Sequence, residues 1–403
     1  LALDMGTTTL AGRLLTPAGK VLAELKISNP QRHFGADVIR RMERAAKGQA
    51  EALQSALVDG LNTLVATLLD TAQLPSTAIS AAAACGNPAI CALLLRQPVR
   101  RLLFPPHRPA DLLGRTVDAS ALRLNLPVPL YLFPLVSGYV GGDLVAFIYG
   151  CSDVVDKTFF IDIGTNGEMA LYHDGHWLTT SVAAGPAFEG GEISCGMTAT
   201  NGAITAVDSC ADHWQLTVCG GGAPRGVSGS GLVAALGTAL EEGLLTRDGR
   251  IVTADEVPSN LARYLVPTAT GQAIRLYRDA CCDLLVTQDD VRAFQLARGA
   301  IRAGTLCLLD KAGMAAEDVA AVIMTGAFGF SLSTESLKKV AMLPEPMLKK
   351  ISFAAAGALG GVERFLRTSA MADVTTLAQQ LRPLPLSGTP AFERVFLNNL
   401  DFV

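Results

Sequence analysis

Two short stretches of the chain repeat the same acidic turn. An apolar run leads into Asp4-Met5-Gly6-Thr7-Thr8, and a second apolar run leads into Asp162-Ile163-Gly164-Thr165-Asn166. A strand that ends in Asp places a carboxylate at the edge of a sheet, and the Gly that follows permits backbone torsions that other residues resist. One copy is typical of an ordinary β-turn. Two copies, one in each half of the chain, favour a pair of turns that grip one polyphosphate from both sides, because turn amides and Thr hydroxyls suit anionic oxygens.

The two repeated carboxylates predict a magnesium site beside this polyphosphate. Mg²⁺ prefers hard oxygen ligands and keeps much of its hydration, so Asp4 and Asp162 would hold it through water. The residues predicted to contact the phosphates are Gly6, Thr7, Thr8 and Thr9 on one side and Gly164, Thr165 and Asn166 on the other. For Thr9 the alternative is a strand residue that faces away, because side chains alternate along a strand.

Two Gly-rich turns later in the chain suit the rest of a nucleotide. The stretch TGAFGF (325–330) follows an apolar run, and Gly326 and Gly329 would let the backbone approach an adenine or its ribose. Phe328 would pack on the adenosine or, equally, belong to the core. Ser230, in the turn GVSGSGL (226–232) that opens an apolar helix, is predicted to be an N-cap, a nucleotide contact or both.

The spacing of apolar residues predicts the elements that position these turns. We expect strands at 1–5, 10–15, 79–85, 158–162, 168–172 and 177–182, a strand running into the Gly-rich turn within 321–330, and helices at 35–48, 51–72, 137–150 and roughly 289–312. Asp174-Gly175 is a strong hairpin signal, and Thr287 with Asp290 fits a capping box. Small residues such as Gly304 permit close packing of the last helix. The Pro-rich segment 97–134 is expected to be an irregular connection.

Composition excludes some classes of function. The 403 residues are half hydrophobic and 17% charged, which predicts two or three domains with sizeable cores. A formal net charge of −4 argues against nucleic acid as a partner, and no stretch predicts a membrane helix. Nine cysteines without a Cys-x-x-Cys pair are typical of cytosolic thiols, so a cytoplasmic location is predicted. The chain begins inside a predicted strand without an initiator Met, and we expect it to be the tail of a longer protein.

A basic patch lies near the first predicted helix. It consists of Arg32, His33, Arg40, Arg41 and Arg44. Such a patch is usually a solvated face, but it could also meet an acidic partner.

The order of phosphate turn, linking helix, second phosphate turn and late Gly-rich turn resembles the superfamily of actin, sugar kinases and heat-shock ATPases. More narrowly, the sequence resembles the C-terminal ATPase region of the reductive activators of corrinoid proteins. The stretches that carry the resemblance are SNPQRHFGADVIRRM (28–42), CGNPAICALLL (85–95), SGYVGGDLVAF (137–147), IDIGTNGEM (161–169), AAGPAFEGGEISCGM (183–197), GVSGSGL (226–232) and TGAFGFSL (325–332). The resemblance implies an α/β fold of two actin-like (ribonuclease H-like) lobes around a central nucleotide cleft. The first lobe would be 1–155, and the second, with the adenosine turn and a C-terminal extension, 156–403.

The chain departs from this pattern in three places. Ala92 stands where many relatives carry His, and Ser228 replaces a common Cys, which bears on the subtype. Such activators also carry an N-terminal ferredoxin-like domain with an iron–sulfur cluster, and no residues here match a cluster site. That domain is expected either to have been removed from this chain or to be lacking in this member.

The resemblance implies an electron transfer that depends on ATP. An activator of this kind passes an electron from its iron–sulfur cluster to a Co(II) corrinoid methyl-carrier protein and returns the cobalt to Co(I), with ATP and Mg²⁺ in the cleft. The superfamily places the residue that orients the attacking water near Asp143, so Asp143 is predicted to be catalytic together with Asp4 and Asp162. A helix-start carboxylate favoured by the helix dipole is the alternative for Asp143.

Other functions stay open at this point. The implied partner is a corrinoid protein, and whether the chain forms a homodimer is undecided. A small-molecule kinase on the same ATPase scaffold is the alternative function, and it would need a hydroxyl-binding pocket and a base near the γ-phosphate. A nucleotide-binding regulator with little turnover is the third.

Overall fold

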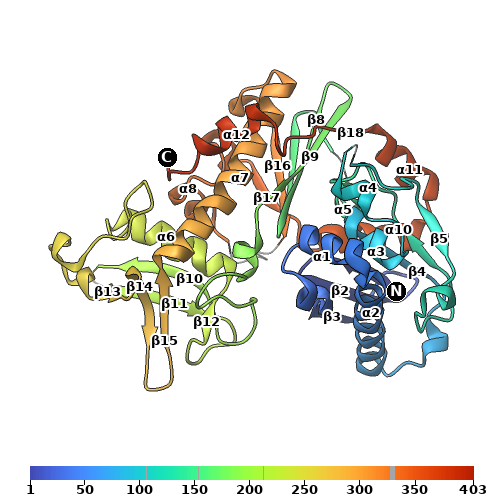
Figure 1. The fold of residues 1–403 in the computed structure, drawn as a ribbon, viewed down its shortest axis with the longest axis horizontal. Helices are drawn as coiled ribbons and strands as arrows, with labels where there is room; N and C mark the ends of the chain where they lie inside the picture. Colours follow the sequence, from blue (N-terminus) through green and yellow to red (C-terminus); the bar gives the residue numbers. More distant parts are fainter. Residues whose placement is uncertain (106, 153, 212, 327–331) are drawn as a thin grey trace. The chain divides into compact units, whose positions relative to one another are not determined.

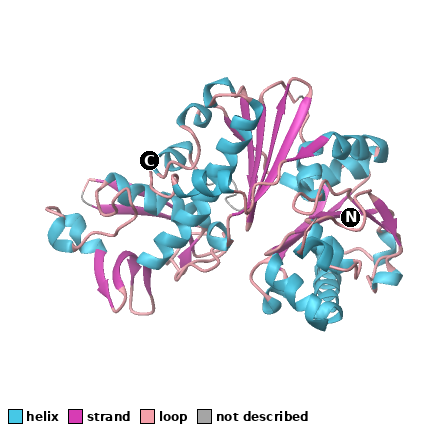
Figure 2. Ribbon diagram, turned by 45° about the horizontal axis from the view of Figure 1, so that its top comes forward, coloured by secondary structure: helices cyan, strands magenta, loops and turns pink. Residues whose placement is uncertain are grey.

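The computed structural model describes residues 1–105, 107–152, 154–211, 213–326 and 332–403 (Figure 1). The chain divides into two compact units. The first comprises Leu1–Val154, Tyr172–Thr180 and Ala356–Pro385, and the second comprises Val155–Leu171, Ser181–Ala355 and Leu386–Val403. Both contain helices and strands (Figure 2), so the predicted α/β class is confirmed. The lobe boundary predicted after residue 155 stays a prediction.

The first unit is built on a six-stranded mixed sheet. Its strand order is β3 (Val21–Ser28), β2 (Thr9–Leu15), β1 (Ala2–Met5), β4 (Ala82–Gly86), β6 (Leu130–Leu132) and β5 (Arg115–Val117). β1 pairs antiparallel with β2 and parallel with β4, and the register places Asp4 beside Cys85. Because β1 and β4 are parallel, the turns that follow them leave the sheet at the same edge.

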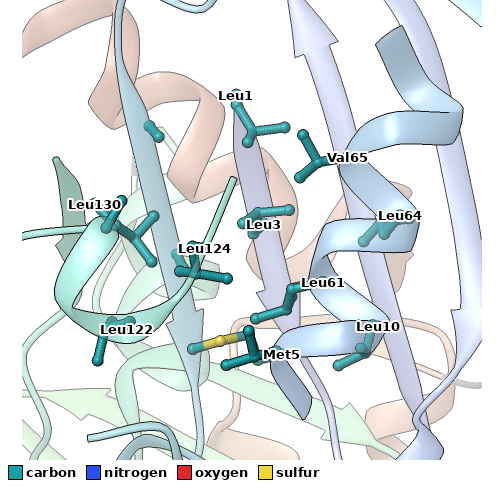
Figure 3. Packing of buried hydrophobic residues seen from close by; sticks show 14 of the residues in the cluster. Leu1, Leu3, Met5, Leu10, Leu61, Leu64, Val65, Leu122, Leu124 and Leu130 are labelled. Carbon is teal, nitrogen blue, oxygen red and sulfur yellow. The ribbon is translucent and has the colours of Figure 1, made fainter. Parts of the chain in front are cut away.

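Helix α2 (Ala50–Ala72) covers one face of this sheet. Its buried residues recur at helical spacing, and among them Leu61 and Leu64 pack in one cluster with Leu3 and Met5 (Figure 3). By length and composition the stretch Val38–Ala72 could cross a membrane, but 56% of its most apolar window is buried. The packing of α2 on the sheet is that of a core helix.

Helices α5 (Gly142–Gly150) and α10 (Gly357–Thr368) lie on the opposite face. Leu130 belongs to the cluster under α2, whereas the next residue, Tyr131, stacks on Phe365 of α10 with 4.5 Å between the ring centroids. Side chains alternate along a strand, so these contacts place α2 and α10 on different faces of the sheet.

Backbone contact joins α5 to α10. A Cβ on Gly361 would lie 1.7 Å from the carbonyl oxygen of Ala146, so only glycine fits there. The remaining elements of the first unit are η1 (Pro30–Phe34), α1 (Val38–Arg44), η2 (Ala45–Gln49), η3 (Ser76–Ala78), α3 (Pro88–Leu94), α4 (Arg100–Leu103), η4 (Ser120–Leu122), α11 (Met371–Gln380) and β18 (Leu381–Pro383), which pairs in parallel with β9 (His176–Ala183).

Two segments of the first unit differ from the sequence prediction. The helix predicted at 35–48 is α1 followed by the π-helical turn η2, and Gly48 (φ 100°) kinks the chain before α2 begins. The segment 97–134 is not irregular throughout, because β5 and β6 lie within it and extend the sheet. The predicted hairpin at Asp174-Gly175 is confirmed, with φ 49° and 73° at the two turn residues, as a type I′ turn requires.

The second unit contains part of another sheet. β17 (Ile351–Phe353), β16 (Ala321–Gly326), β7 (Thr158–Ile163) and β8 (Asn166–His173) are adjacent in this order. β16 is parallel to both β17 and β7. The register places Thr325 beside Asp162 and Gly326 beside Ile163, so the strand that carries Asp162 and the strand that ends at Gly326 are neighbours.

The longest helix of the second unit is α7 (Gln288–Ala312). Thr287 and Asp290 form the predicted capping box at its start. A Cβ on Gly304 would lie 2.9 Å from the Met169 Cε atom, so the predicted close packing of small residues is confirmed.

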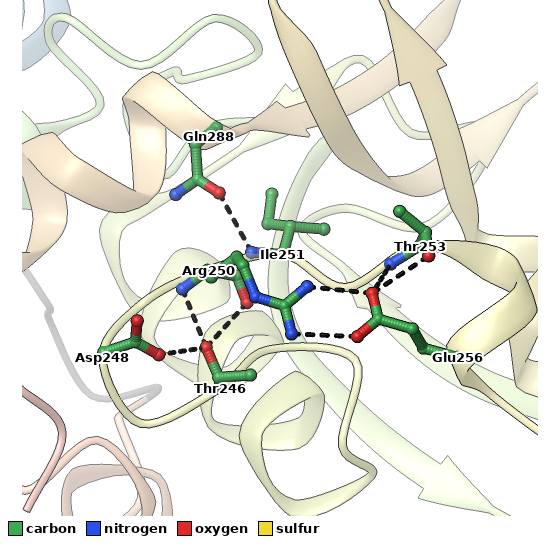
Figure 4. Close-up of polar contacts among 7 residues, drawn as sticks. All are labelled: Thr246, Asp248, Arg250, Ile251, Thr253, Glu256 and Gln288. Carbon is green, nitrogen blue, oxygen red and sulfur yellow. Dashed lines mark hydrogen bonds and ion pairs between the residues drawn. The ribbon is translucent and has the colours of Figure 1, made fainter.

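Smaller elements complete the second unit. One three-stranded sheet has the order β11 (His213–Val218), β10 (Ala203–Cys210) and β12 (Gly226–Val227), and another has β13 (Leu265–Thr268), β14 (Gly271–Arg278) and β15 (Asp283–Thr287). The helices are η5 (Pro186–Glu189), α6 (Gly229–Glu241), η6 (Ala254–Glu256), η7 (Asn260–Tyr264), η8 (Ala316–Asp318), α8 (Thr334–Lys339), α9 (Glu345–Leu348) and α12 (Pro390–Leu397). Polar contacts tie the loop before β13 to α7 (Figure 4): the Ile251 amide donates to Gln288 at 3.0 Å, and Arg250 pairs with both oxygens of Glu256 at 2.8 and 2.9 Å.

Candidate functional site

The alternation of β1 directs Asp4 toward the start of α5. Leu3 and Met5, on either side of Asp4, belong to the cluster under α2, so Asp4 points to the opposite face of the sheet. Asp143 lies in the first turn of α5 and is close enough for its charge to raise the pKa of Asp4. The structure therefore brings together two of the three residues predicted to be catalytic.

Loss of hydration raises the pKa of both carboxyls. It is the largest cause for Asp4, whose pKa is raised to about 7, and the charge of Asp143 is the second cause. The pKa of Asp143 is raised to about 6, again mainly by burial. A hydrogen bond from the Cys85 thiol, 3.7 Å from Asp4 Oδ1, opposes the shift of Asp4 only in part. A cation bound between two such carboxylates would stabilise their charged forms.

A glycine allows α5 to begin so close to the end of β4. A Cβ on Gly141 would lie 2.6 Å from the carbonyl oxygen of Gly86 and 2.7 Å from Asp143 Oδ1. Any side chain at this position would push Asp143 away from the sheet edge, so the sequence Gly141-Gly142-Asp143 is what sets the carboxylate in place.

The first acidic turn is held by residues far away in the sequence. Asn29 donates from its side chain to the carbonyl oxygen of Gly6 at 2.9 Å and from its backbone amide to that of Thr8 at 2.7 Å. Arg41 donates to the carbonyl oxygen of Thr7 at 2.7 Å. Asn87, just after β4, donates to the Thr7 hydroxyl at 3.0 Å.

These bonds fix the direction of the turn amides. In a trans peptide the C=O and the following N–H point in opposite directions. The carbonyls of Gly6 and Thr7 point at Asn29 and Arg41, so the N–H groups of Thr7 and Thr8 point to the other side of the turn. That side can present amides to anionic oxygens, as the sequence predicts.

The sequence groups Arg41 with the cations of the basic patch, but in the structure Arg41 is buried. None of its surface is exposed, because its guanidinium donates inward to Thr7 and also to the carbonyl oxygen of Gly35 at 2.9 Å. It is a support of the turn and not a surface charge. Asn29, Asn87 and Arg41 were absent from the predicted site residues, although all three lie in the stretches 28–42 and 85–95 that carry the family resemblance.

Thr9, the last residue predicted in the first turn, is the first residue of β2 and pairs with Ser28 of β3. Thr9 is thus part of a strand, which agrees with the alternative interpretation of this residue as far as its backbone is concerned. Its contact with phosphate stays a prediction.

The second acidic turn has its own second carboxylate. Thr165, which is buried, donates its hydroxyl hydrogen to Glu189 at 2.5 Å. A Cβ on Gly164 would lie 3.3 Å from the other carboxylate oxygen of Glu189. The Gly164 amide donates to the carbonyl oxygen of Asn166 at 2.9 Å and closes the turn. Glu189 was absent from the predicted site residues, and its place beside the turn is a finding of the structure.

Ser230 is buried in the first turn of α6. The N-cap of α6 is Ser228, whose side chain accepts from the amide of Gly231 at 3.2 Å, so the N-cap role does not belong to Ser230. The Ser230 hydroxyl lies 3.0 Å from that of Ser228. A Cβ on Gly229 would lie 1.8 Å from the carbonyl oxygen of Phe188, so α6 begins in direct contact with the segment that carries Glu189.

Gly326 completes the candidate site in the second unit. Its φ is +116°, and a Cβ there would lie 2.2 Å from the carbonyl oxygen of Ile163. The absence of a side chain lets β16 end directly against the strand that carries Asp162. Phe328 and Gly329, also predicted to contact adenosine, lie outside the described residues.

We expect Gly326→Ala to lower the free energy of unfolding by about 3 kcal/mol or more, because it combines a strained positive φ with a backbone overlap. Gly313→Ala is the matched control: its φ is +65°, but a Cβ there meets no atom within 4 Å, so only the conformational cost of about 1 kcal/mol remains. Urea unfolding measures both values. Equal losses in the two variants would show that the contact with Ile163 contributes nothing.

Each unit holds carboxylates of the kind that bind a hard divalent cation. Asp4 and Asp143 lie together in the first unit. In the second unit Glu189 contacts Thr165, three residues after Asp162 at the end of β7. All four offer oxygen ligands of the kind that Mg²⁺ prefers. Their chemistry is consistent with the predicted metal-binding roles of Asp4 and Asp162.

Comparisons with known proteins match the whole chain. Residues 156–403 match the family described as the C-terminal domain of RACo, the ASKHA domain, and residues 1–152 match the RACo middle region. The chain is 28% identical over 424 residues to the corrinoid activation enzyme RamQ of Eubacterium limosum. The aligned region covers 100% of this chain and 70% of that protein. It is 23% identical over 444 residues to the Co(II) methylated amine-specific corrinoid protein reductase of Methanosarcina barkeri, covering 100% of this chain and 76% of that protein.

A solved structure agrees with these relatives. The chain matches a reductive activator for a corrinoid, iron–sulfur protein with a TM-score of 0.93 and 30% identity over its whole length. It spans 65% of the length of that solved chain.

Proposed function

Because the chain belongs to the RACo family, with the middle region followed by the C-terminal ASKHA domain, we propose that it is the ATP-binding part of a reductive activator of a corrinoid protein. The actin-like fold predicted from the sequence is the fold of this family. The reaction is a one-electron reduction of Co(II) to Co(I) in the corrinoid of a partner protein. The electron comes from an iron–sulfur domain outside this chain, and the reaction takes place in the cytoplasm, where nine free thiols stay reduced.

The observation that carries the proposal is the pair of acidic turns, each backed by a second carboxylate. Gly6, Thr7, Thr8 and Thr9 would bind the phosphates of ATP from one turn, and Gly164, Thr165 and Asn166 from the other. Asp4 and Asp162 would hold Mg²⁺ through water, and the ion would shield the charge of the phosphates. Asp143 would orient the attacking water, and a partly desolvated carboxyl with a raised pKa suits that role. Ser230, Gly326, Phe328 and Gly329 would contact the remainder of the nucleotide.

ATP can drive an uphill electron transfer only through differential binding. It must bind one conformation, or the partner-bound state, more tightly than the other, and the difference in binding free energy sets how far the electron's equilibrium moves. We therefore propose ATP hydrolysis coupled to electron transfer as the enzymatic activity. The small-molecule kinase gains no support from any contact described above, and a homodimer stays a prediction.

The test mixes the full-length protein with a reductant, ATP and a Co(II) corrinoid protein, and follows the absorbance of Co(I). We expect Co(I) to form only when ATP and the protein are both present. A panel of corrinoid proteins that all remain Co(II) would contradict the proposed function, and ATP-dependent phosphorylation of a small hydroxyl compound would favour the kinase.

Asp162→Ala is expected to lower the rate of this reaction by about 100-fold or more, because a charged ligand is lost from the phosphate site. Asp59→Ala, an exposed position on α2, is the matched control and should leave the rate unchanged. Circular dichroism should show both variants folded. Full activity in a folded Asp162→Ala protein would overturn the assignment of this turn.

A further inference from the structure

A pocket lined by cations opens where η1, α1 and η2 meet in the first unit. Its volume is ≈ 580 Å³, and its charged lining consists of Arg32, His33, Arg40, Arg44, Lys47 and Glu43. We call it the basic pocket. No residue assigned to the candidate nucleotide site lines it, so the proposed ATPase chemistry leaves it without a role.

The positive charge of the basic pocket is largely uncompensated. Within the part of the chain that the structure describes, Arg32, Arg44 and Lys47 form no ion pair, while Arg40 pairs with Asp37 at 3.5 Å. Glu43 is the only acid in the lining. The chain as a whole has a formal charge of −4, so this concentration of cations runs against the average and attracts anions to one place.

The exposure of these side chains indicates the kind of anion. All five basic residues are exposed, whereas a site dedicated to one small anion surrounds it with buried donors. Long, mobile side chains around an open hollow suit several carboxylates spread over a segment of protein. Ile39, 49% exposed and one helical turn before Glu43, adds an apolar contact of the kind found at protein interfaces.

The wall of the pocket is fixed relative to the first acidic turn. Gly35 lines the pocket, and its carbonyl oxygen accepts from Arg41, which also donates to the carbonyl oxygen of Thr7. Arg41 is buried between them. A partner held in the pocket therefore contacts the segment that supports the turn predicted to bind phosphate.

We propose that the basic pocket is the docking site for an acidic segment of a protein partner. The association is steered by opposite charge and weakens as salt is added, because the contributing side chains are exposed. This inference holds whether or not the partner is a corrinoid protein.

The test measures binding of a fluorescent decaglutamate peptide to the full-length protein by anisotropy, with decaglutamine as the uncharged probe. The double variant Arg44→Glu, Lys47→Glu reverses the sign of the pocket's net charge. The double variant Lys20→Glu, Lys349→Glu changes the net charge equally at exposed positions outside the pocket. We expect the pocket variant to bind decaglutamate about tenfold more weakly and the control variant to stay within about twofold of the unchanged protein. If the pocket variant does not fold, Arg32→Glu on η1 takes its place, with Lys20→Glu alone as its control.

Three results would overturn the inference. Equal weakening in the two double variants would mean that only net charge matters. Displacement of the peptide by inorganic phosphate at equal charge concentration would show a small-anion site. Equal binding of decaglutamate and decaglutamine would show that charge attraction does not drive the association. A failure of Co(I) formation concerns the proposed function alone, because the peptide assay contains no corrinoid.

Discussion

Replacing Asp4 with Asn will abolish ATP-dependent formation of Co(I) and will also raise the melting temperature of the nucleotide-free protein at pH 8. The loss of activity, about 100-fold or more, follows from removing a charge that faces the metal and phosphates. The gain in stability follows from the same environment. The pKa of Asp4 is raised to about 7 by burial and by the charge of Asp143, so at pH 8 the folded protein holds a charge that its surroundings disfavour.

The sign of the pH dependence follows from proton counts. The pKa of Asp4 is near its ordinary value of 3.8 in the unfolded chain and about 7 in the folded protein. Between these values the folded state binds more protons than the unfolded state, so its stability falls as the pH rises through this window. The Asn side chain does not ionise, so Asp4→Asn removes this decrease in stability. We expect a gain on the order of 1–3 kcal/mol at pH 8, which for a unit of this size raises the melting temperature by several degrees.

Calorimetry from pH 4 to pH 8 checks this expectation. The curves of the unchanged and variant proteins should meet near pH 4 and separate above it. Asp59→Asn, at an exposed position on α2, controls for the chemical change from Asp to Asn. Two curves that stay parallel across the range would show that Asp4 is well hydrated and that no strained carboxyl pair exists.

Local patterns predicted the features that depend on neighbouring residues. The strand-Asp-x-Gly-Thr turns, the capping box at Thr287 and Asp290 and the hairpin at Asp174-Gly175 are each fixed by a few adjacent residues. The structure contains the last two as predicted and places a strand before each acidic turn. Their physical causes are side-chain capping and positive φ at glycine. Both act over a few residues, so both can be predicted from the sequence.

Contacts between distant residues were the features that sequence alone missed. The strands β5 and β6 have three residues each, and their pairing depends on β4, which a Pro-rich segment does not reveal. Glu189 reaches Thr165 across 24 positions. Arg41 looked like one of several surface cations. Helical spacing shows which residues share a face of a helix, but it shows whether that face is buried only when the segment that packs on it is known. The carbonyl acceptor of Arg41 lies 34 positions away.

Replacing Arg41 with Met will destabilise the first unit and weaken ATP binding together. The guanidinium donates to the carbonyl oxygens of Thr7, Gly35 and Ala36. Met keeps much of the volume but leaves these buried acceptors without a donor, which costs about 3–5 kcal/mol. The carbonyl of Thr7 is then free to rotate, and the N–H of Thr8 rotates with it. We expect the affinity for ATP to fall by about tenfold or more.

Arg298→Met separates the two effects. Arg298 is also fully buried, and it donates to the carbonyl oxygens of Ala341 at 2.8 Å and Asp401 at 2.6 Å. Its loss should cost a similar free energy of unfolding without touching either acidic turn. Urea unfolding gives the stability of both variants, and calorimetric titration with ATP, at a temperature where both are folded, gives the affinity. If both variants lose affinity in proportion to stability, Arg41 acts only as a core residue. A loss confined to Arg41→Met would mean that the direction of the turn's amides is what binds the phosphates.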